Sequence, residues 1–355
     1  MEFGWDDTQS KLYDRVLSFA RDRLSTAPTP GASIDNLRLC GDFGLLGLCV
    51  DRRYGGMGLV FSVCAHLFAC VSAIQDFADD RLKQEVLPRL ASGEWLGANA
   101  ITETDAGSDV FALKTRAVRE GDEYVIDGAK SHVTNAPAAD VFLVYALTDP
   151  AHGYLGVSAF AVPRTSPGIV VGPPFDKIGL RSTPSAELRL EKCRVPVSNI
   201  VGERGQGALI FRASMIWERA CLFAAYVGMM EEQLEKTILF AKERRQFGKP
   251  IGKHQAVAHR IADMKLRLES ARLLVYRACW LKDRGTSSAL ESSLAKLAVS
   301  EAAIQSGIDA IWVHGGAGVK TETGIAQGLL DALPSAIFSG TSDIQRDLIA
   351  RELLL

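Results

Sequence analysis

The sequence predicts a mainly α-helical protein with a β-rich domain in its middle. Apolar residues recur at helical spacing in the first and last parts of the chain, whereas between about residues 98 and 207 they alternate with polar ones. With 355 residues, the chain is also too long for one core of ordinary size. We therefore expect an N-terminal helical domain over residues 1–97, a middle β-barrel over 98–207 and a C-terminal four-helix bundle over 208–355.

The N-terminal part has the pattern of helices that bury one face. Apolar side chains spaced three or four residues apart occur in two segments, 12–20 and 82–90. Between them, the glycine-rich string 54–58 breaks the pattern and leads into the apolar segment 59–67. Because this segment is apolar nearly all round, we expect it to be buried.

The middle part has the period of a β-strand. Ala186, Leu188 and Leu190 alternate with charged residues and predict a half-buried strand, while the apolar run 141–145 predicts a fully buried one. Turn residues such as Gly121 separate the runs, as a meander or barrel requires.

The last part returns to helical spacing over long segments. Only two prolines, Pro250 and Pro334, follow residue 207, so long uninterrupted helices fit. Between residues 268 and 279 the apolar side chains share one face, and Gly285 is placed to end that helix. Short connections between long amphipathic helices are typical of an antiparallel bundle.

Composition argues against several classes of protein. The 40 Lys and Arg against 42 Asp and Glu give a net charge of −2, which disfavours a nucleic-acid-binding protein. The 7 cysteines are scattered without a CxxC pair, so neither a disulfide framework nor a zinc ribbon is expected. No apolar run approaches the roughly 18 residues of a membrane span, and the first residues lack the order of a signal peptide. We expect a cytoplasmic protein that neither binds nor crosses a membrane.

Three potential metal ligands, Cys64, His66 and Cys70, lie close together in the sequence. A closed zinc site needs a fourth ligand, and none is placed nearby. In an apolar helix, cysteine and histidine side chains of this kind are more often packed in the core. We therefore expect no metal site.

Five strings of the sequence resemble the acyl-CoA dehydrogenase family of flavoproteins, and in this order and spacing they span essentially the whole chain. They are residues 101–109, 133–135, 243–251, 315–316 and 339–346. The resemblance implies the family's fold of N-terminal helices, central barrel and C-terminal bundle. It also implies that the cofactor is FAD.

Short hydroxyl side chains on loops of the middle domain suit a flavin. A flavin ring presents carbonyl and nitrogen acceptors at its edge, to which Thr102, Ser108 and Thr134 can donate. The alternative is that these hydroxyls only cap turns. The resemblance implies that the flavin contacts in this domain come from Ile101, Thr102, Gly107, Ser108, His132 and Thr134.

Two adjacent arginines, Arg244 and Arg245, offer planar guanidinium groups that can donate paired hydrogen bonds to a pyrophosphate. The alternative is that they lie on a solvated helix face. In the family the matching stretch reaches across a subunit interface to the adenine-dinucleotide half of FAD. The resemblance implies that the FAD-binding residues there are Arg244, Gln246, Phe247, Gln255, Gly316, Thr341 and Asp343. It also implies a homo-oligomer, a tetramer, because each flavin is built from two chains.

The chain differs from the family pattern at three points. His132 stands where an aromatic ring that packs on the flavin is common, and Trp312 stands where many members have Gln. Between Gly58 and Leu59 the chain lacks a helix that members normally have. The third difference affects a region that usually borders the acyl pocket.

Dehydrogenation of a thioester needs a carboxylate that takes the α-proton while the flavin accepts the β-hydride. Most of the family has a Glu directly before the Gly-Thr of the last string, but here that residue is Ser339. A minority places the base on a bundle helix directly before an Arg, which matches Glu218 and Arg219. Apolar neighbours would desolvate the Glu218 carboxylate and raise its proton affinity, and the alternative is a surface Glu paired with an Arg. We expect Glu218 to be the catalytic base, and Arg219 and Ser339 to bind substrate.

Four strings narrow the resemblance to the L-prolyl-carrier-protein dehydrogenases of pyrrole-forming antibiotic biosynthesis. They are residues 62–70, 134–142, 214–219 and 337–343, and that subgroup shares both the Ser before Gly-Thr and the Glu after Trp. The resemblance implies FAD-dependent oxidation of an L-prolyl thioester on the phosphopantetheine arm of a peptidyl carrier protein, toward a pyrrole-2-carboxyl thioester. The alternatives are an acyl-CoA dehydrogenase for short or branched acyl chains and a non-catalytic flavoprotein that binds a partner.

Overall fold

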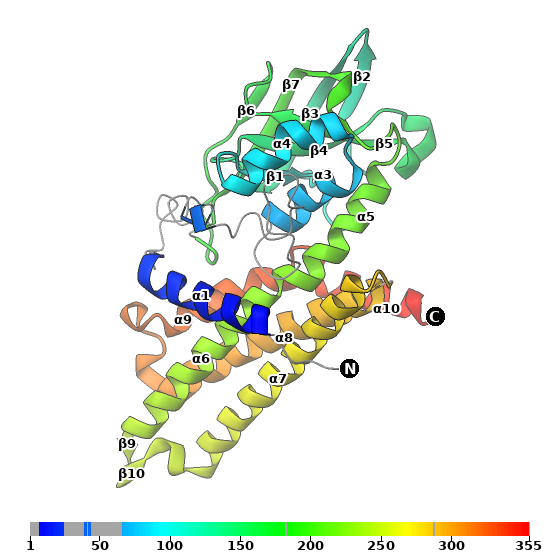
Figure 1. The fold of residues 1–355 in the computed structure, drawn as a ribbon. Coiled ribbons are helices and arrows are strands. Elements are labelled where there is room, and N and C mark those ends of the chain that lie inside the picture. The colour runs from blue at the N-terminus through cyan, green and yellow to red at the C-terminus, as the bar shows by residue number, and fades with distance from the viewer. Residues whose placement is uncertain are drawn as a thin grey trace.

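A sheet at one end of the molecule and long helices at the other make up the described part of the chain (Figure 1). The computed structural model describes residues 7–24, 39–40, 42–43, 66–181, 183–286 and 288–354. The predicted order of elements, helices before and after a β-rich middle, is confirmed. No described helix has both the length and the apolarity that a membrane crossing requires.

The N-terminal part is helical wherever the structure describes it at length. Its elements are α1 (Asp7–Arg23), a π-helical turn (His66–Val71), α3 (Ser72–Phe77) and α4 (Asp80–Ser92). The buried face predicted within 82–90 is confirmed. α4 begins after Asp79, whose side chain accepts a hydrogen bond from the amide of Leu82. The glycine-rich string 54–58 and the junction between Gly58 and Leu59 lie outside the described residues.

Eight strands in the middle of the sequence form one sheet. They are β1 (Gly97–Ala100), β2 (Arg116–Glu120), β3 (Glu123–Thr134), β4 (Val141–Leu147), β5 (Val157–Pro163), β6 (Ile169–Val171), β7 (Ser185–Pro196) and β8 (Ile200–Val201). Their spatial order is β6-β7-β3-β2-β4-β5-β8, and β1 pairs in parallel with β4. The predicted closed barrel is not found among the described residues, because the terminal strands β6 and β8 are only 3 and 2 residues long and do not pair with each other.

The apolar run at 141–145 lies in β4 and is buried on both faces of the sheet, as predicted. Leu143 and Tyr145 belong to a core shared with the helices. Phe142 and Val144 belong to a second core, which they share with β3 and β7. Burial on both faces explains why this strand is apolar at every position instead of at alternate ones.

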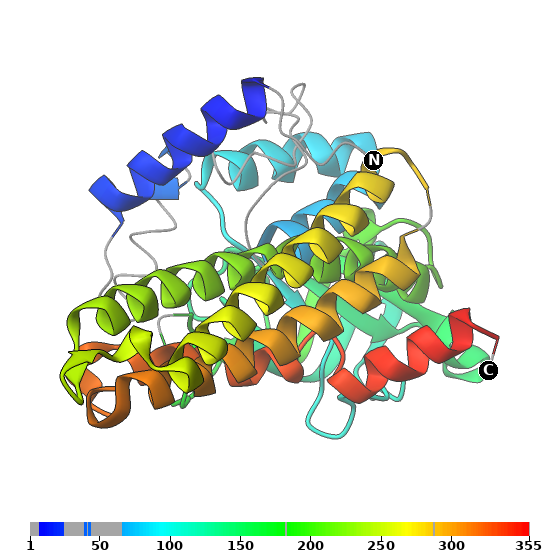
Figure 2. The same ribbon diagram turned by 90° about the horizontal axis from the view of Figure 1, so that it is seen from below.

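Helices form the C-terminal part, and the three longest lie side by side in both views (Figure 1 and Figure 2). The helices are α5 (Gly207–Trp217), α6 (Ala224–Glu243), α7 (Gln255–Asp283), α8 (Ala289–His314), α9 (Ile325–Ala332) and α10 (Ser342–Glu352). α6, α7 and α8 pack against one another, and α9 and α10 pack on α8. The apolar face between 268 and 279 is buried and α7 ends just before Gly285, whose φ is +67°, so both predictions are confirmed. The grouping of four helices into one bundle stays a prediction.

α5 connects the two regions of the molecule (Figure 1). It packs on β5, on α3 and on the π-helical turn His66–Val71. A second π-helical turn, Glu218–Leu222, follows α5 directly and packs on α7 and α8. The junction of α5 and α6 therefore places residue 218 where sheet and helices meet.

Candidate active site

A buried carboxylate lies at this junction. Glu218 begins the π-helical turn Glu218–Leu222, and 8% of its surface is exposed. Such turns are frequent at functional sites. Burial raises the pKa of Glu218, while the hydroxyl of Ser339 and the charge of Arg219 act in the opposite direction. The alternative of a surface Glu is therefore wrong for this residue.

Ser339 lies directly against Glu218, although the two are 121 positions apart in the sequence. The Ser339 hydroxyl donates a hydrogen bond to Oε1 of Glu218. Ser339 occupies the turn before α10 with a φ of +56°, a conformation that residues other than glycine seldom adopt. The two positions considered for the base thus face each other, and only one of them carries a carboxylate.

Two side chains hold the backbone of this turn. Nε of Arg219 donates to the carbonyl oxygen of Ser339 at 2.9 Å. Nε2 of Gln345, on α10, donates to the carbonyl oxygens of Ser339 at 3.2 Å and Gly340 at 3.0 Å. Arg219 therefore joins Glu218 and Ser339 in one cluster, which confirms that these three predicted residues lie together but not what each of them does.

Three buried polar residues near this cluster were missed by the sequence analysis. They are Tyr145 on β4, Lys296 on α8 and Gln345 on α10. Burial raises the pKa of the Tyr145 phenol, and the nearby Cys70 and Glu218 raise it further, while the nearby Ser214 acts in the opposite direction. No local sequence signal marks Tyr145, because its strand is apolar throughout.

Lys296 is fully buried, with its Nζ atom 5.7 Å from the centroid of the Phe223 ring. Burial and, next, the charge of Arg219 lower the pKa of Lys296 to about 8, against a smaller opposite effect of Glu301. A lysine among the small and apolar residues of the helix was the available signal for this residue.

The predicted flavin-binding residues around Thr102 lie at the end of β1. The carbonyl oxygen of Thr102 accepts a hydrogen bond of 2.8 Å from the amide of Ser131 on β3, which ties this loop to the next predicted segment. Ile101 is buried, whereas Gly107 and Ser108 are exposed farther along the loop. Two segments of the predicted flavin site that are far apart in the sequence, the loop after β1 and the end of β3, are therefore adjacent in the fold.

His132 and Thr134 lie at the end of β3, where its pairing with β7 is irregular. The register shifts between Lys130 and Val133, and His132 has a φ of +53°. The imidazole of His132 lies 5.1 Å from the ring of Phe175, measured between centroids. The bulge turns His132 out of the regular alternation of the strand.

A buried ion pair connects the loop after β1 to β3. Nζ of Lys130 donates to Oε1 of Glu103 at 2.8 Å and to the carbonyl oxygen of Ile101 at 3.2 Å. The Glu103 carboxylate also accepts from the amides of Lys114 at 2.6 Å and Thr115 at 3.0 Å. Burial lowers the pKa of Lys130 to about 8 in spite of Glu103. Burial opposes ionisation of Glu103, but Lys130 and these hydrogen bonds outweigh it and hold its pKa below the usual range.

Other predicted FAD-binding residues lie far from the sheet, at the end of the long helices. Arg244, Gln246 and Phe247 belong to the hairpin of β9 (Arg245–Gln246) and β10 (Lys249–Pro250), which Figure 1 shows at the tip of the helices. Gln255 begins α7 and Gly316 follows α8 at the same end. All five are exposed, and Phe247 is 93% exposed. Within one chain they are not brought to the Glu218 cluster.

Thr341 and Asp343 stand next to the cluster at the start of α10. The Thr341 hydroxyl accepts a hydrogen bond of 3.2 Å from the amide of Ile344 and so caps the helix. Asp343 is exposed in the first turn. The predicted dinucleotide-binding residues thus fall into two groups in a single chain.

Trp312, which replaces a common Gln of the family, is 60% exposed on α8. The guanidinium carbon of Arg260 lies 4.5 Å from the centroid of its ring.

His66 and Cys70 are buried, and Nδ1 of His66 accepts from the amide of Gly97 at 2.9 Å, so both have packing roles. Cys64 lies outside the described residues.

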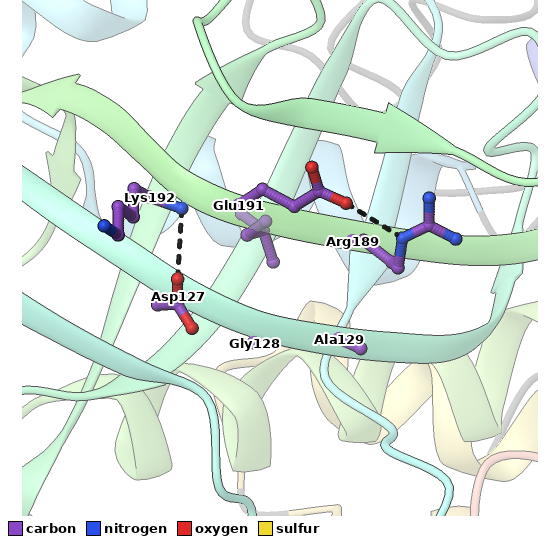
Figure 3. Close-up of a pocket in the computed structure, with 7 residues that line it drawn as sticks. Asp127, Gly128, Ala129, Arg189, Glu191 and Lys192 are labelled. Carbon is purple, nitrogen blue, oxygen red and sulfur yellow. Dashed lines mark hydrogen bonds and ion pairs between the residues drawn. The ribbon is translucent and has the colours of Figure 1, made fainter.

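A hollow on the sheet between β3 and β7 contains none of the predicted site residues (Figure 3). It is lined by Asp127, Gly128, Ala129, Arg189, Leu190, Glu191 and Lys192. Its polar groups satisfy one another, since Arg189 donates to Glu191 at 3.2 Å and the amide of Lys192 donates to Asp127 at 3.1 Å. The Glu218 cluster, and not this hollow, is the candidate active site.

The fold and the Glu218–Ser339 cluster together define a class of protein. Residues 98–193 match the middle domain of acyl-CoA dehydrogenases, and residues 205–354 match their C-terminal domain. The chain belongs to the acyl-CoA dehydrogenase family.

Within this family, similar relatives carry a more particular name. The chain is 50% identical over 380 residues to an L-prolyl-(peptidyl-carrier protein) dehydrogenase of Pseudomonas fluorescens, with 100% of both chains covered. It is 41% identical over 379 residues to an enzyme of the same name from a Serratia species, covering 99% of this chain and 98% of the other. These alignments run longer than the 355 residues of the chain, so the relatives contain residues that have no counterpart here.

Solved structures agree with these relatives. The structure described as PigA with FAD and proline superposes with a TM-score of 0.96 at 40% identity and covers 100% of both chains. The prolyl acyl carrier protein oxidase AnaB superposes with a TM-score of 0.96 at 37% identity, covering 99% of this chain and 100% of that one.

Proposed function

We propose that the protein is an FAD-dependent dehydrogenase that oxidises an L-prolyl thioester on a peptidyl carrier protein toward a pyrrole-2-carboxyl thioester. The single observation that carries this proposal is the buried Glu218 carboxylate facing Ser339, at the position where the family's usual base is absent. The names of the Pseudomonas and Serratia relatives and of the two prolyl-related structures support the substrate.

Glu218 is the group proposed to take the α-proton of the prolyl thioester. The thioester carbonyl acidifies this proton, and the buried carboxylate has a raised proton affinity, which suits a general base near neutral pH. The Ser339 hydroxyl holds one carboxylate oxygen and so fixes the direction of the other. A serine hydroxyl itself cannot hold the abstracted proton at neutral pH.

The loops at the sheet fit FAD by the chemistry of their donors. Thr102 and Thr134 are half-buried and Ser108 is exposed, so their hydroxyls are open to a bound group that presents acceptors. Ile101, Gly107 and His132 complete this part of the proposed pocket. When bound, FAD supplies the acceptor for the hydride that leaves Cβ. Arg219 and Ser339 are proposed to contact the substrate.

The dinucleotide half of FAD is proposed to be held by a second copy of the chain in a tetramer. The exposed Arg244, Gln246, Phe247, Gln255 and Gly316 would reach the Thr341 and Asp343 of another subunit. The 93% exposure of Phe247, a large apolar side chain, supports a partner at that end of the helices.

We also propose the division into domains 1–97, 98–207 and 208–355, with a four-helix bundle in the last. The family matches at 98–193 and 205–354 support it, as does the change from strands to helices after β8.

The proposed pathway is the cytoplasmic biosynthesis of a pyrrole-containing antibiotic, supported by the strings at 62–70 and 337–343.

Substrate choice tests the proposed function. L-prolyl-carrier protein, L-prolyl-CoA and butyryl-CoA are offered separately and without oxygen to the FAD-loaded protein, and flavin bleaching and product mass are followed. We expect the carrier-bound prolyl group to bleach the flavin fastest and to lose hydrogen. Bleaching by butyryl-CoA alone would support an acyl-CoA dehydrogenase instead, and a yellow protein bleached by none would support a binding protein.

Replacing Ser339 with Ala is expected to slow flavin reduction about tenfold at a pH where Glu218 is partly protonated, because a hydrogen bond to the carboxylate is lost. The hydroxyl lowers the pKa of Glu218, so its removal moves the rise of the rate to higher pH. The measurement is the rate of anaerobic flavin reduction across pH. If the pH at which the rate is half of its maximum is unchanged, the Ser339 hydroxyl does not act on the Glu218 carboxylate.

A further inference from the structure

The Ser339 turn has a backbone conformation that needs outside support. Ser339 and Gly340 both have positive φ values, +56° and +86°. For serine this conformation costs free energy, and it persists only where neighbouring groups hold it. The hydroxyl of Ser339 reaches Glu218 only while the turn keeps this shape.

Gln345 makes two of the contacts that hold the turn. Its side chain is fully buried, and its Nε2 atom donates to the carbonyl oxygens of both residues, at 3.2 Å to Ser339 and 3.0 Å to Gly340. The fit is close: a Cβ atom added at Gly340 would lie 2.7 Å from Nε2 of Gln345. A side chain at position 340 would therefore force the Gln345 amide to shift.

We propose that Gln345 is a positioning residue, which fixes the Ser339 turn so that the Ser339 hydroxyl stays on the carboxylate of Glu218. This inference rests on the proposed function of Glu218. Gln345 itself acts through Ser339, because both of its donor contacts are to the turn. Loss of its amide would leave two carbonyl oxygens with fewer donors and let the strained serine relax.

Two neighbouring groups lower the pKa of Glu218: the Ser339 hydroxyl, from the turn before α10, and the charge of Arg219, on the same turn as Glu218. The charge of Glu218 in turn raises the pKa of Tyr145 on β4, and the charge of Arg219 lowers the pKa of Lys296 on α8. Gln345 donates only to the backbone carbonyls of Ser339 and Gly340, so its loss should act on Glu218 by way of the Ser339 hydroxyl.

The test compares Gln345→Met with Gln233→Met, a change of the same kind at another buried glutamine, on α6. The probe is the pH dependence of anaerobic flavin reduction, with whichever thioester reduces the wild-type flavin. We expect Gln345→Met to move the midpoint to higher pH in the same direction as Ser339→Ala. Below the midpoint the rate should be roughly 3- to 10-fold slower, which is the effect of losing one ordinary hydrogen bond. FAD content and the rate at high pH should stay close to wild type, and Gln233→Met should leave the midpoint unchanged.

A double variant separates positioning from mere stability. If Gln345 acts through Ser339, Ser339→Ala/Gln345→Met moves the midpoint no farther than the larger single shift. Additive shifts, or a wild-type midpoint in Gln345→Met, would overturn the inference. Gln345→Leu also removes the amide donors without adding a charge and serves in the same comparison if the Met variant does not fold. Failure of the proposed function looks different, because then the wild-type flavin is not reduced by carrier-bound proline.

Discussion

Replacing Glu218 with Gln is expected to slow flavin reduction by carrier-bound L-proline by roughly 10²- to 10⁴-fold, the usual loss on removing a general base. The amide keeps the size of the side chain and can still accept from the Ser339 hydroxyl, but it cannot hold a proton. Because Glu218 contacts Ser339 and Arg219 instead of the loops proposed for the flavin, FAD content should stay normal. The measurement is single-turnover bleaching of the flavin without oxygen.

Glu232→Gln is the matched control, since this glutamate lies on the neighbouring α6, is exposed and pairs with Lys236 at 2.7 Å. Its rate should equal that of the wild type.

In the wild type, reduction should become faster as pH rises, because the active form of Glu218 is the carboxylate. The rise should come at a higher pH than for an ordinary glutamate, since burial raises the pKa of Glu218.

Replacing Glu103 with Gln is expected to destabilise the protein by about 3–5 kcal/mol, the usual cost of leaving one partner of a buried ion pair without the other. Lys130 has a side chain with no exposed surface and pairs with Glu103 at 2.8 Å. The loop from Ile101 to Ser108 should lose one of its ties to β3 as well, so FAD should bind more weakly. The measurements are the midpoint of thermal unfolding of the FAD-free protein and the dissociation constant for FAD.

Lys114→Met is the control for this prediction, because Lys114 forms an exposed pair with Asp105 at 2.8 Å on the same loop. An exposed pair contributes about 0–1 kcal/mol, so little change is expected. Glu103→Gln/Lys130→Met should be more stable than Glu103→Gln alone, since no unpaired charge remains buried. A double variant as unstable as the single one would show that the hydrogen bonds of Glu103, and not the pair, dominate.

The contribution of Glu103 to stability should depend on pH in a definite direction. Its pKa is lower in the folded than in the unfolded protein. Its contribution is therefore fully present above the unfolded value and is lost as the pH falls through the folded value. The difference in stability between wild type and Glu103→Gln should accordingly shrink in acid.

Sequence patterns were sufficient where a local period decides the structure. The buried faces of α4 and α7 follow from spacing alone, because a helix with one apolar stripe has one way to bury it. The open sheet was not predictable in this way. Short strands such as β8 leave no period in the sequence, and closure depends on whether distant strands pair.

The candidate site was predictable in part. Glu218 and Ser339 were identified by position in known strings, while the contact between them joins residues 121 apart and needed the fold. Tyr145, Lys296 and Gln345 were missed because the sequence does not show which polar side chains are buried or what they face. The bulge that turns His132 outward depends on the pairing of β3 with β7 and has no local signal either.

The most direct test of the central claim, that the Glu218 carboxylate is the base, compares four proteins in anaerobic single turnover with carrier-bound L-proline: wild type, Glu218→Gln, Ser339→Glu and Glu218→Gln/Ser339→Glu. Because positions 218 and 339 are in hydrogen-bond contact, a carboxylate at 339 lies near the same proton. We predict that Glu218→Gln nearly abolishes flavin reduction and that the double variant recovers part of it with normal FAD content. A Glu218→Gln protein that bleaches its flavin as fast as the wild type would contradict the account.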